Sequence, residues 1–302
     1  MFKKYILGGG ISALVYQFYN RDYTIISPEI GGQLKMQFQP PKILHKNKFT
    51  EKLLTDLNLP LDSSTIKMRY LKDKKLLDSI SVQDKQSFIN KKMSEYDTKF
   101  SNVIFSDTKL SVEENYIDYF TVPMTKVLEK LTEESSDIIN AKVILHNSNN
   151  KMLGLHDYST LQYSHIVSTI PANDYQHITY TGEKKNLKYL PVTYVYADCL
   201  LNGIDMSNCD WVYICDRDIP FNRISKLGDY FVYECTGVIE QDKCENYFGE
   251  ETCVDTTIQR LGVIFTNEFV DTESVTFLGR LAQYKHDVKL QDVINKSIRG
   301  GE

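Results

Sequence analysis

The residues with the clearest chemical meaning form a glycine-rich turn near the start of the chain. Gly8-Gly9-Gly10-Ile11-Ser12-Ala13 fits the pattern G-x-G-x-x-A and follows an apolar run, residues 5–7, that is typical of a strand. In a strand–turn–helix unit, Gly8 permits the sharp turn, Gly10 lets main-chain N–H groups approach a pyrophosphate, and the small Ala13 lets the helix pack on the sheet. A glycine run can be only a flexible loop, but here both flanks fit, so the turn predicts a dinucleotide-binding site.

A second set of candidate residues follows the next expected strand, residues 23–26. The dinucleotide-binding pattern has an acidic residue there for the ribose hydroxyls, but this chain has Ser27, with Glu29 two places later. Either side chain could contact a ribose. Gly31-Gly32-Gln33 then forms a turn, which is only a loop in an ordinary fold but is a place for close main-chain approach to a cofactor pyrophosphate after such a strand.

The elements that must position these turns alternate between strand and helix. Residues 5–7, 11–19 and 23–26 have the pattern of a strand, an amphipathic helix and a strand, which begins a βαβ unit. Residues 48–135 have mainly helical spacing, interrupted by short strands. From residue 141 the pattern turns to β, with a helix expected at 256–265, a strand at 274–278 and a closing helix at 290–298. The sequence therefore predicts an α/β fold.

Composition and charge argue against several other classes of function. The chain has 302 residues, a net charge of −5 and no run near the roughly 18 apolar residues that a membrane span needs. The charge argues against a nucleic-acid groove as the main function, because such surfaces need a basic excess. The six cysteines form no Cys-x-x-Cys pair, and the histidines have no metal-ligand spacing. We expect a cytoplasmic protein that acts on a small molecule and holds no metal.

Three ordered motifs give the chain a resemblance to a known group. The first motif is the pair of glycine turns described above, the second is the expected strand at residues 166–171, and the third is the segment 277–281. They resemble the FAD motifs of the superfamily that contains amine oxidases, protoporphyrinogen oxidase and UDP-galactopyranose mutase. Within that group, residues 41–47, 219–224 and 279–284 are most similar to UDP-galactopyranose mutase. The chain departs from the mutase pattern at Lys42, where the first mutase histidine would stand, and at Tyr247-Phe248-Gly249, which replaces Tyr-Tyr-Pro.

The resemblance implies that FAD is the cofactor and that residues far apart in sequence hold it. Gly279 and Arg280 would lie near the flavin, and the main chain of Asp292 and Val293 would face cofactor oxygens from the start of the last helix. The main chain of Val143 would pair with adenine, although a β-branched residue at this point is equally typical of a core strand. Arg280 could instead be an ordinary surface ion-pair partner.

The resemblance also implies catalytic positions. Lys42 and His45 would lie near the reactive edge of the flavin, where a lysine can bond N5 or hold a water and a histidine can move protons near neutral pH. Arg223 and Tyr284 would face the substrate, since the planar fork of arginine suits phosphate or carboxylate groups. The ordinary alternative is that loop residues such as Lys42 and His45 are simply solvated.

The predicted architecture is a Rossmann-like FAD-binding domain, with a parallel sheet and a β-meander, interleaved with a mixed helical and β domain. Residues 1–45, 137–180 and 255–302 would form the discontinuous FAD-binding domain. Residues 46–136 and 181–254 would form the substrate-binding domain. At 302 residues, the chain is long enough to bury a sizeable core either as one α/β unit or as two interleaved domains.

Three functions remain open from the sequence. The first is an FAD-dependent oxidoreductase that acts on an amine-like or related small substrate through flavin N5. The second is a flavin-dependent isomerase of a nucleotide sugar, similar to UDP-galactopyranose mutase, with no net redox change; the scarcity of arginine argues against a strong diphosphate site. The third is an FAD-binding protein without turnover.

Overall fold

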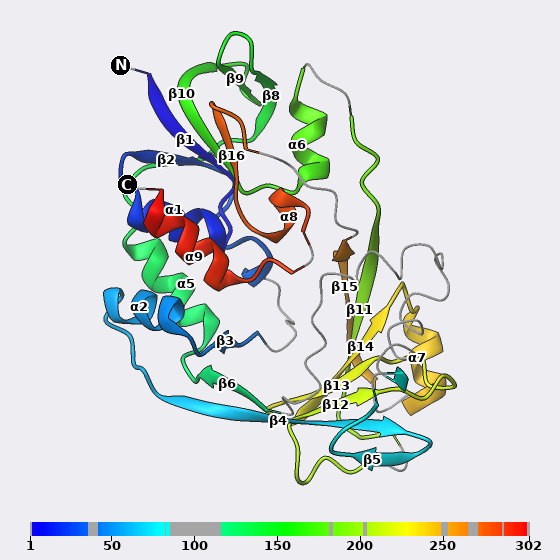
Figure 1. Ribbon diagram of the computed structural model, residues 1–302. Coiled ribbons are helices and arrows are strands. Elements are labelled where there is room, and N and C mark those ends of the chain that lie inside the picture. The colour runs from blue at the N-terminus through cyan, green and yellow to red at the C-terminus, as the bar shows by residue number, and fades with distance from the viewer. Residues whose placement is uncertain are drawn as a thin grey trace.

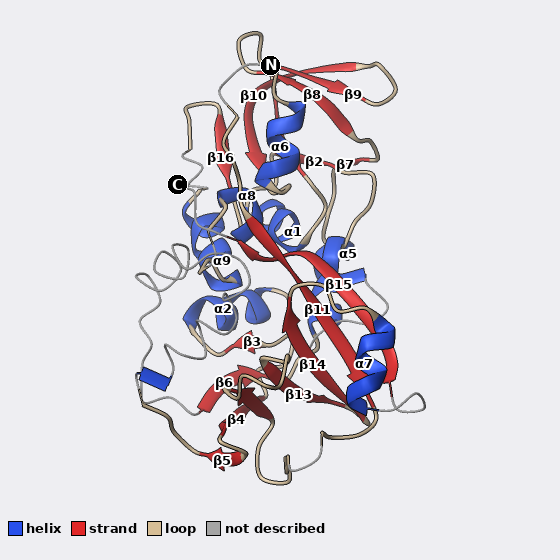
Figure 2. Ribbon diagram, turned by 90° about the vertical axis from the view of Figure 1, so that its right-hand side faces the viewer, coloured by secondary structure: helices blue, strands red, loops and turns tan. Residues whose placement is uncertain are grey.

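The computed structural model describes residues 2–35, 42–81, 83–84, 116–180, 184–201, 204–248, 253–264, 271–285 and 287–300. These residues form two β-sheets, and a layer of helices packs against the first sheet (Figures 1 and 2). The prediction of a mixed α/β fold is confirmed. The finer description as a Rossmann-like domain, and the residue ranges of the two domains, stay predictions.

The first sheet contains both parallel and antiparallel strands, in the order β7-β2-β1-β10-β9-β8, with β16 paired to β10. Its strands are β1 (Lys3–Leu7), β2 (Tyr23–Ile26), β7 (Ile138–Ile139), β8 (Val143–Asn147), β9 (Met152–Leu155), β10 (Thr160–Ser168) and β16 (Val275–Phe277). β1 runs parallel to both β2 and β10, and β16 runs parallel to β10. The carboxyl ends of these four strands therefore meet at one edge, which is where open α/β sheets bind ligands.

The second sheet has the strand order β15-β11-β14-β13-β12-β4-β6-β3, with β5 paired to β4. Its strands are β3 (Leu44–His45), β4 (Ser63–Lys72), β5 (Lys75–Leu77), β6 (Tyr116–Phe120), β11 (Tyr189–Ala197), β12 (Trp211–Ile214), β13 (Arg223–Leu227), β14 (Tyr230–Thr236) and β15 (Cys253–Ile264). The helices are α1 (Ile11–Tyr19), η1 (Gly32–Lys35), α2 (Lys48–Asp56), α5 (Met124–Glu133), α6 (Ala172–Ile178), α7 (Gln241–Phe248), α8 (Arg280–Gln283) and α9 (Leu290–Arg299). No described helix could cross a membrane, because none is both long and apolar enough.

The helix predicted at residues 256–265 is wrong over its described part. Residues 253–264 form β15, which pairs antiparallel with β11 along most of its length. Thr256, Thr257 and Ile258 are β-branched, so they are poorly suited to a helix and well suited to a strand. The open edge of β11 supplies the hydrogen-bonding partner that makes the strand stable.

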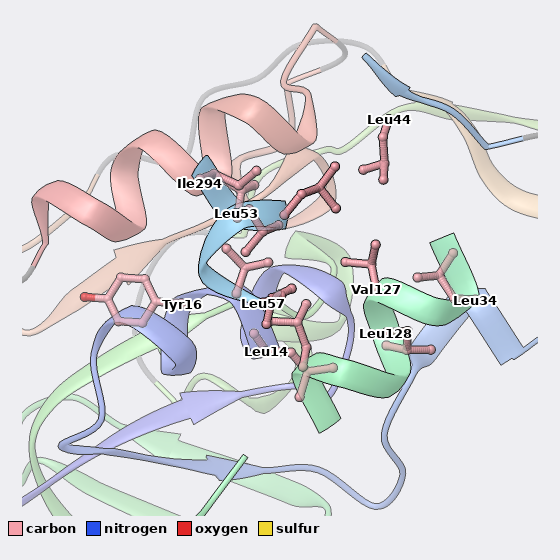
Figure 3. Packing of buried hydrophobic residues seen from close by; sticks show 14 of the residues in the cluster. Leu14, Tyr16, Leu34, Leu44, Leu53, Leu57, Val127, Leu128 and Ile294 are labelled. Carbon is pink, nitrogen blue, oxygen red and sulfur yellow. The ribbon is translucent and has the colours of Figure 1, made fainter. Parts of the chain in front are cut away.

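The main hydrophobic core packs the helices on one face of the first sheet. Figure 3 shows Leu14 of α1, Leu53 of α2, Val127 of α5 and Ile294 of α9 converging on one another, and all four are 0% exposed. Burying an aliphatic side chain of this size contributes about 1.5–3 kcal/mol. Ala13 is also 0% exposed, as the predicted close packing of this small residue requires. The core fixes the start of α1 relative to the strand ends.

A buried polar cluster ties α6 to the opposite face of this sheet. The ring of His146 is 2.6 Å from the Tyr163 hydroxyl through Nε2 and 2.9 Å from the Tyr175 hydroxyl through Nδ1. A neutral imidazole has one donor and one acceptor nitrogen, so it donates to one tyrosine and accepts from the other. Burial lowers the pKa of His146 from its ordinary value of 6.5 to about 4.

This cluster predicts that the protein loses stability in mild acid. Since the pKa of His146 is lower in the folded than in the unfolded chain, its contribution is complete above pH 6.5 and is lost as the pH falls towards 4. The whole contribution corresponds to about 3 kcal/mol. Urea unfolding between pH 7 and 4 should show a steeper loss for the wild type than for His146→Gln. Equal slopes would contradict the prediction, since the two proteins differ only at residue 146.

Candidate cofactor and substrate site

The first glycine turn lies at the carboxyl ends of β1, β2 and β10. The N–H of Gly8 donates to Ile26 O at 3.0 Å, and the N–H of Thr169 donates to Leu7 O at 2.9 Å. Gly8 has φ of 104°, and a Cβ there would lie 2.7 Å from the Thr169 hydroxyl oxygen. Only glycine combines this backbone conformation with this close approach, so the turn brings the ends of three strands together.

The second glycine turn packs directly on the first. The N–H of Gly31 donates to Gly9 O at 2.8 Å, and a Cβ on Gly9 would lie only 2.2 Å from Glu29 O. A Cβ on Gly32, which has φ of 52°, would lie 3.3 Å from the Cα of Gly10. The two motifs predicted separately from the sequence thus form one surface.

The C-terminal motif completes this surface. Gly279 has φ of 90°, and a Cβ on it would lie 2.7 Å from the Ser12 hydroxyl oxygen and 4.0 Å from Val293. Ser12 lies in the first turn of α1 and Val293 in the first turn of α9. Residues from the two ends of the described chain therefore meet at the start of α1. We call residues 8–12, 31–32 and 279 the glycine cradle.

Gly10 differs from Gly8, Gly9, Gly32 and Gly279, because a Cβ on it would meet no described residue within 4 Å. Gly10 is the N-cap of α1 and provides no side-chain cap, and no acidic residue lies in the first turn. The start of a helix carries partial positive charge and unpaired N–H groups, which together suit an anion. The open space and these donors fit the phosphates of a dinucleotide.

The remaining predicted cofactor residues lie around the cradle in different surroundings. The Ser27 hydroxyl, which is 6% exposed, donates to Glu29 O at 2.6 Å and so holds the second turn. Gln33 lies in η1, and its side chain is outside the described part of the chain. Val143 is half-buried in β8 opposite Leu155. The Asp292 carboxylate accepts the Lys289 N–H at 2.8 Å and therefore caps α9.

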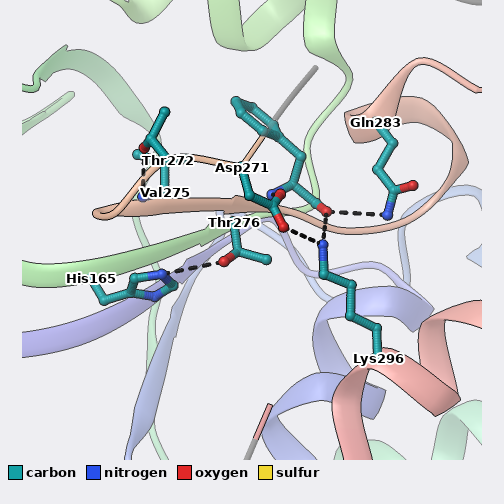
Figure 4. Close-up of polar contacts among 8 residues, drawn as sticks. His165, Asp271, Thr272, Val275, Thr276, Gln283 and Lys296 are labelled. Atoms are coloured by element: carbon teal, nitrogen blue, oxygen red, sulfur yellow. Dashed lines mark hydrogen bonds and ion pairs between the residues drawn. The ribbon is translucent and has the colours of Figure 1, made fainter. Parts of the chain in front are cut away.

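A polar clamp that the sequence gave no sign of holds the C-terminal motif in place (Figure 4). Lys296 of α9 donates to the Asp271 carboxylate at 2.6 Å and to Phe277 O at 3.1 Å. Gln283 of α8 donates to the same carbonyl at 3.1 Å, and the Phe277 N–H donates to Asp271 at 2.8 Å. The clamp joins β16, α8 and α9, and so positions Gly279 between them.

The loop that carries Lys42 and His45 is fastened to α9. His45 O accepts from the side chains of Asn47, at 2.9 Å, and Thr50, at 2.5 Å. The Asn47 amide also donates to Gln291 of α9 at 2.9 Å. Burial, followed by repulsion from Lys289, lowers the pKa of His45, so its imidazole is neutral near pH 7. Figure 1 shows β3 below the helices, where it pairs with β6 at the end of the second sheet.

Lys42, which belongs to this loop, and Arg280 form a positively charged region. Burial of the Lys42 ammonium end, followed by repulsion from Arg280, lowers the pKa of Lys42, although the residue as a whole is exposed. Burial also lowers the pKa of Arg280. Within the described residues, neither side chain forms an ion pair with a carboxylate; Arg280 donates to Gly262 O and Leu261 O, each at 3.0 Å.

The second sheet presents a row of polar and aromatic side chains on one face. The strand register places Tyr194, Glu234, Arg223 and Tyr213 side by side on β11, β14, β13 and β12. We call these four residues the polar row. Their sequence neighbours Val195, Tyr233, Ile224 and Val212 point to the other face and pack into a hydrophobic core with α7. The face that carries the polar row is therefore the one that does not pack against α7.

Arg223 is already paired within this row. Its Nη2 donates to the Glu234 carboxylate at 2.8 Å, and its guanidinium lies 4.6 Å from the centre of the Trp211 ring. Ile43, next to Lys42, packs on the cluster that contains Trp211. The structure thus brings Arg223 near the Lys42 loop. Glu234, Tyr194 and Tyr213 were missed by the sequence analysis, and the alternation of faces along β11–β14 was the available signal.

Tyr284 lies in a hydrophobic cluster with Leu187, Leu261 and Ile264. It is 0% exposed, and its hydroxyl donates to Lys188 O at 2.9 Å. The residue has φ of 55° and ends α8. Among the described residues, no three His, Cys, Asp or Glu side chains are grouped so that they could hold a metal ion.

Comparison with known proteins gives the fold but no sequence relative. No protein-family model and no curated protein matches the sequence. Among solved structures, reduced UDP-galactopyranose mutase has a TM-score of 0.65 at 9% identity, over 99% of this chain and 94% of that one. A CLA-producing fatty acid isomerase from P. acnes has 0.65 at 10%, over 98% and 97%.

A third solved structure belongs to the oxidase side of the same group. A putrescine oxidase variant from a redesign of cofactor binding has a TM-score of 0.63 at 10% identity, over 99% of this chain and 97% of that one. At these identities the likeness concerns the fold. The predicted resemblance to the group of amine oxidases and UDP-galactopyranose mutase is confirmed at that level: the chain has their fold over almost its whole length.

Proposed function

We propose that the protein is an FAD-dependent enzyme whose glycine cradle holds the cofactor pyrophosphate. One observation carries the proposal: three glycine motifs converge on the start of α1, where a Cβ added to Gly10 would meet no atom of the described residues within 4 Å. The fold that the chain shares with a mutase, an isomerase and an oxidase supports it. The cofactor-binding part would consist of residues 1–45, 137–180 and 255–302, although β15 is hydrogen-bonded into the second sheet.

The described residues suit particular parts of such a cofactor. The N–H groups of Ile11 and Ser12 would bond the pyrophosphate, and Ser27 or Glu29 would contact a ribose. Val143 would pair its main chain with adenine. Gly279, together with the starts of α8 and α9, would adjoin the flavin end, near the positive charges of Lys42 and Arg280. Contacts within the protein hold Ser27, Gly279 and Asp292, so this part of the proposed site would be preorganised.

We propose that the reaction is the oxidation of an amine-like or related small substrate. A bound flavin supplies a hydride acceptor at N5. The neutral imidazole of His45 can take a proton from the substrate, because its pKa is lowered. Lys42 can hold a water or a flavin atom by hydrogen bonding, and the polar row would orient the substrate and exclude water.

Separate measurements test the cofactor and the reaction class. Purified protein should be yellow, release a nucleotide with the mass of FAD and, after its removal, bind added FAD with a stoichiometry near one in titration calorimetry. Anaerobic bleaching of the flavin by a substrate would support the oxidoreductase. A protein that refuses FAD would contradict the whole proposal. A bound flavin that no substrate class alters would favour an FAD-binding protein without turnover.

A nucleotide-sugar isomerase is the second candidate, and the charge of the site favours it. The side chains of Lys42 and Arg280 lack a carboxylate partner among the described residues, while the single carboxylate of the polar row is bonded to Arg223. This excess of positive charge suits a diphosphate. Activity on UDP-galactopyranose only after reduction with dithionite would establish this function, and bleaching by an amine would exclude it.

A further inference from the structure

The short helix α8 lies between the glycine cradle and the second sheet. Gly279, just before it, is in contact with Ser12 of α1. Figures 1 and 2 both show α8 between α1 and α9 on one side and the ends of β11 and β15 on the other. Since the chain continues from α8 into α9, this segment contacts the second sheet through its side chains.

Two side chains of this segment are anchored on the second sheet. Arg280 donates through Nη1 to Gly262 O and through Nη2 to Leu261 O, both at 3.0 Å, so both arms of its fork are used by main-chain carbonyls of β15. Tyr284 donates to Lys188 O at 2.9 Å, immediately before β11. β11 and β15 pair with each other, with Tyr189 opposite Ile264. Both anchors therefore hold the same end of one strand pair.

The segment between the anchors is rigid. The N–H of Gln283 donates to Gly279 O at 3.0 Å, and the N–H of Lys285 donates to Arg280 O at 3.1 Å, which closes a single helical turn. Tyr284 and Leu261 belong to one hydrophobic cluster, with Leu281 packed against it. A Cβ on Gly262 would lie 2.3 Å from Val192, so β11 and β15 approach each other closely where Arg280 binds. A small shift of α8 cannot be absorbed there without moving the strands.

The same strand pair carries part of the candidate substrate face. Tyr194 of β11 belongs to the polar row, and its hydroxyl donates to Gln259 of β15 at 3.2 Å. Tyr194 lies opposite Thr257, further along the strands from the anchors. The position of α8 therefore affects where the polar row stands relative to the cradle.

We propose that Arg280 and Tyr284 are positioning residues that couple occupation of the glycine cradle to the β11–β15 strand pair, with Arg280 acting as a strut between the two sheets. The inference rests on the proposed function, because it takes FAD as the occupant of the cradle. It assigns Arg280 and Tyr284 to main-chain carbonyls of the second sheet, in place of direct contact with flavin and substrate.

Hydrogen–deuterium exchange with FAD as the probe tests this coupling without a substrate. In the wild type, FAD should slow exchange about fivefold at amides of residues 189–197 and 255–264, as well as at the cradle. Tyr284→Phe keeps the buried ring and removes only the donor to Lys188. It should bind FAD within about threefold of the wild-type affinity, protect the cradle, and lose the protection of β11.

Arg280→Lys keeps the charge but cannot bond both carbonyls as a fork. It should retain FAD binding and lose the protection of β15, whereas the control Arg299→Gln, on the exposed end of α9, should behave as wild type. Full protection of the strand pair in both Arg280→Lys and Tyr284→Phe would overturn the inference. So would protection confined to the cradle in the wild type. Failure of the wild type to bind FAD would instead overturn the proposed function, and the coupling with it.

Discussion

Replacing Gly10 with valine should severely weaken FAD binding while lowering the free energy of unfolding by no more than about 1 kcal/mol, the cost of a poorer helix N-cap. The backbone of Gly10 has φ of −77° and ψ of 177°, which valine adopts readily, and a Cβ there meets no protein atom within 4 Å. The added side chain would occupy the space through which a pyrophosphate approaches the first N–H groups of α1. We expect a loss of at least about 100-fold in FAD affinity, equivalent to about 2.8 kcal/mol. Titration calorimetry and thermal unfolding of the FAD-free protein measure the two quantities.

Gly9→Ala is the matched comparison. A Cβ on Gly9 would lie 2.2 Å from Glu29 O, so this smaller substitution forces the two glycine turns apart. It should destabilise the protein even without cofactor, by about 1–3 kcal/mol. The opposite order of effects, a stable Gly9→Ala and an unstable Gly10→Val, would show that the cradle is not arranged as described. If Gly10→Val bound FAD as tightly as the wild type, this turn would not be the binding site of the cofactor phosphates.

Glu234→Leu should lower the free energy of unfolding by about 3 kcal/mol, because it leaves the Arg223 charge without its partner. The two side chains are only 19% and 15% exposed, and the distance of 2.8 Å between Nη2 and the carboxylate is that of a strong charge-assisted bond. Burial lowers the pKa of Arg223, but the charge of Glu234 outweighs this effect and the net pKa is raised. Urea unfolding followed by circular dichroism measures the loss.

The double variant Arg223→Met with Glu234→Leu distinguishes the ion pair from simple packing. A buried ion pair replaced by apolar residues of similar size often costs little, so the double variant should recover most of the stability that Glu234→Leu loses. A double variant as unstable as the sum of the single changes would show that the two residues act independently. In that case Arg223 and Glu234 would not stabilise the polar row as a pair.

The sequence was sufficient to predict the glycine turns and the main helices. The glycine motifs were recognisable because backbone conformations such as that of Gly8, with φ of 104°, leave little choice of residue. The closing helix was predicted at residues 290–298 and runs from Leu290 to Arg299. Its apolar spacing suffices because one face packs into the core.

Other features depend on contacts that no local pattern encodes. β15 forms a strand because β11 offers it an edge, and this overrides the helical spacing of residues 256–264. The clamp of Lys296 with Asp271, and the pairing of Arg223 with Glu234, join residues whose spacing carries no motif. Glu234 stands in an alternating strand, where a charged residue is ordinarily taken to be solvent-facing. Its role became apparent only from the register of β13 and β14.

The contact of Gly279 with Ser12 has a consequence for how the protein is made. The first glycine turn leaves the ribosome long before the residue that closes over it, so a partly synthesised chain has half a cradle and nothing to retain a nucleotide. On the proposed function, FAD would therefore be loaded late in biosynthesis, and a chain stopped by a premature codon before Gly279 should emerge colourless even if its first sheet and α1 have formed.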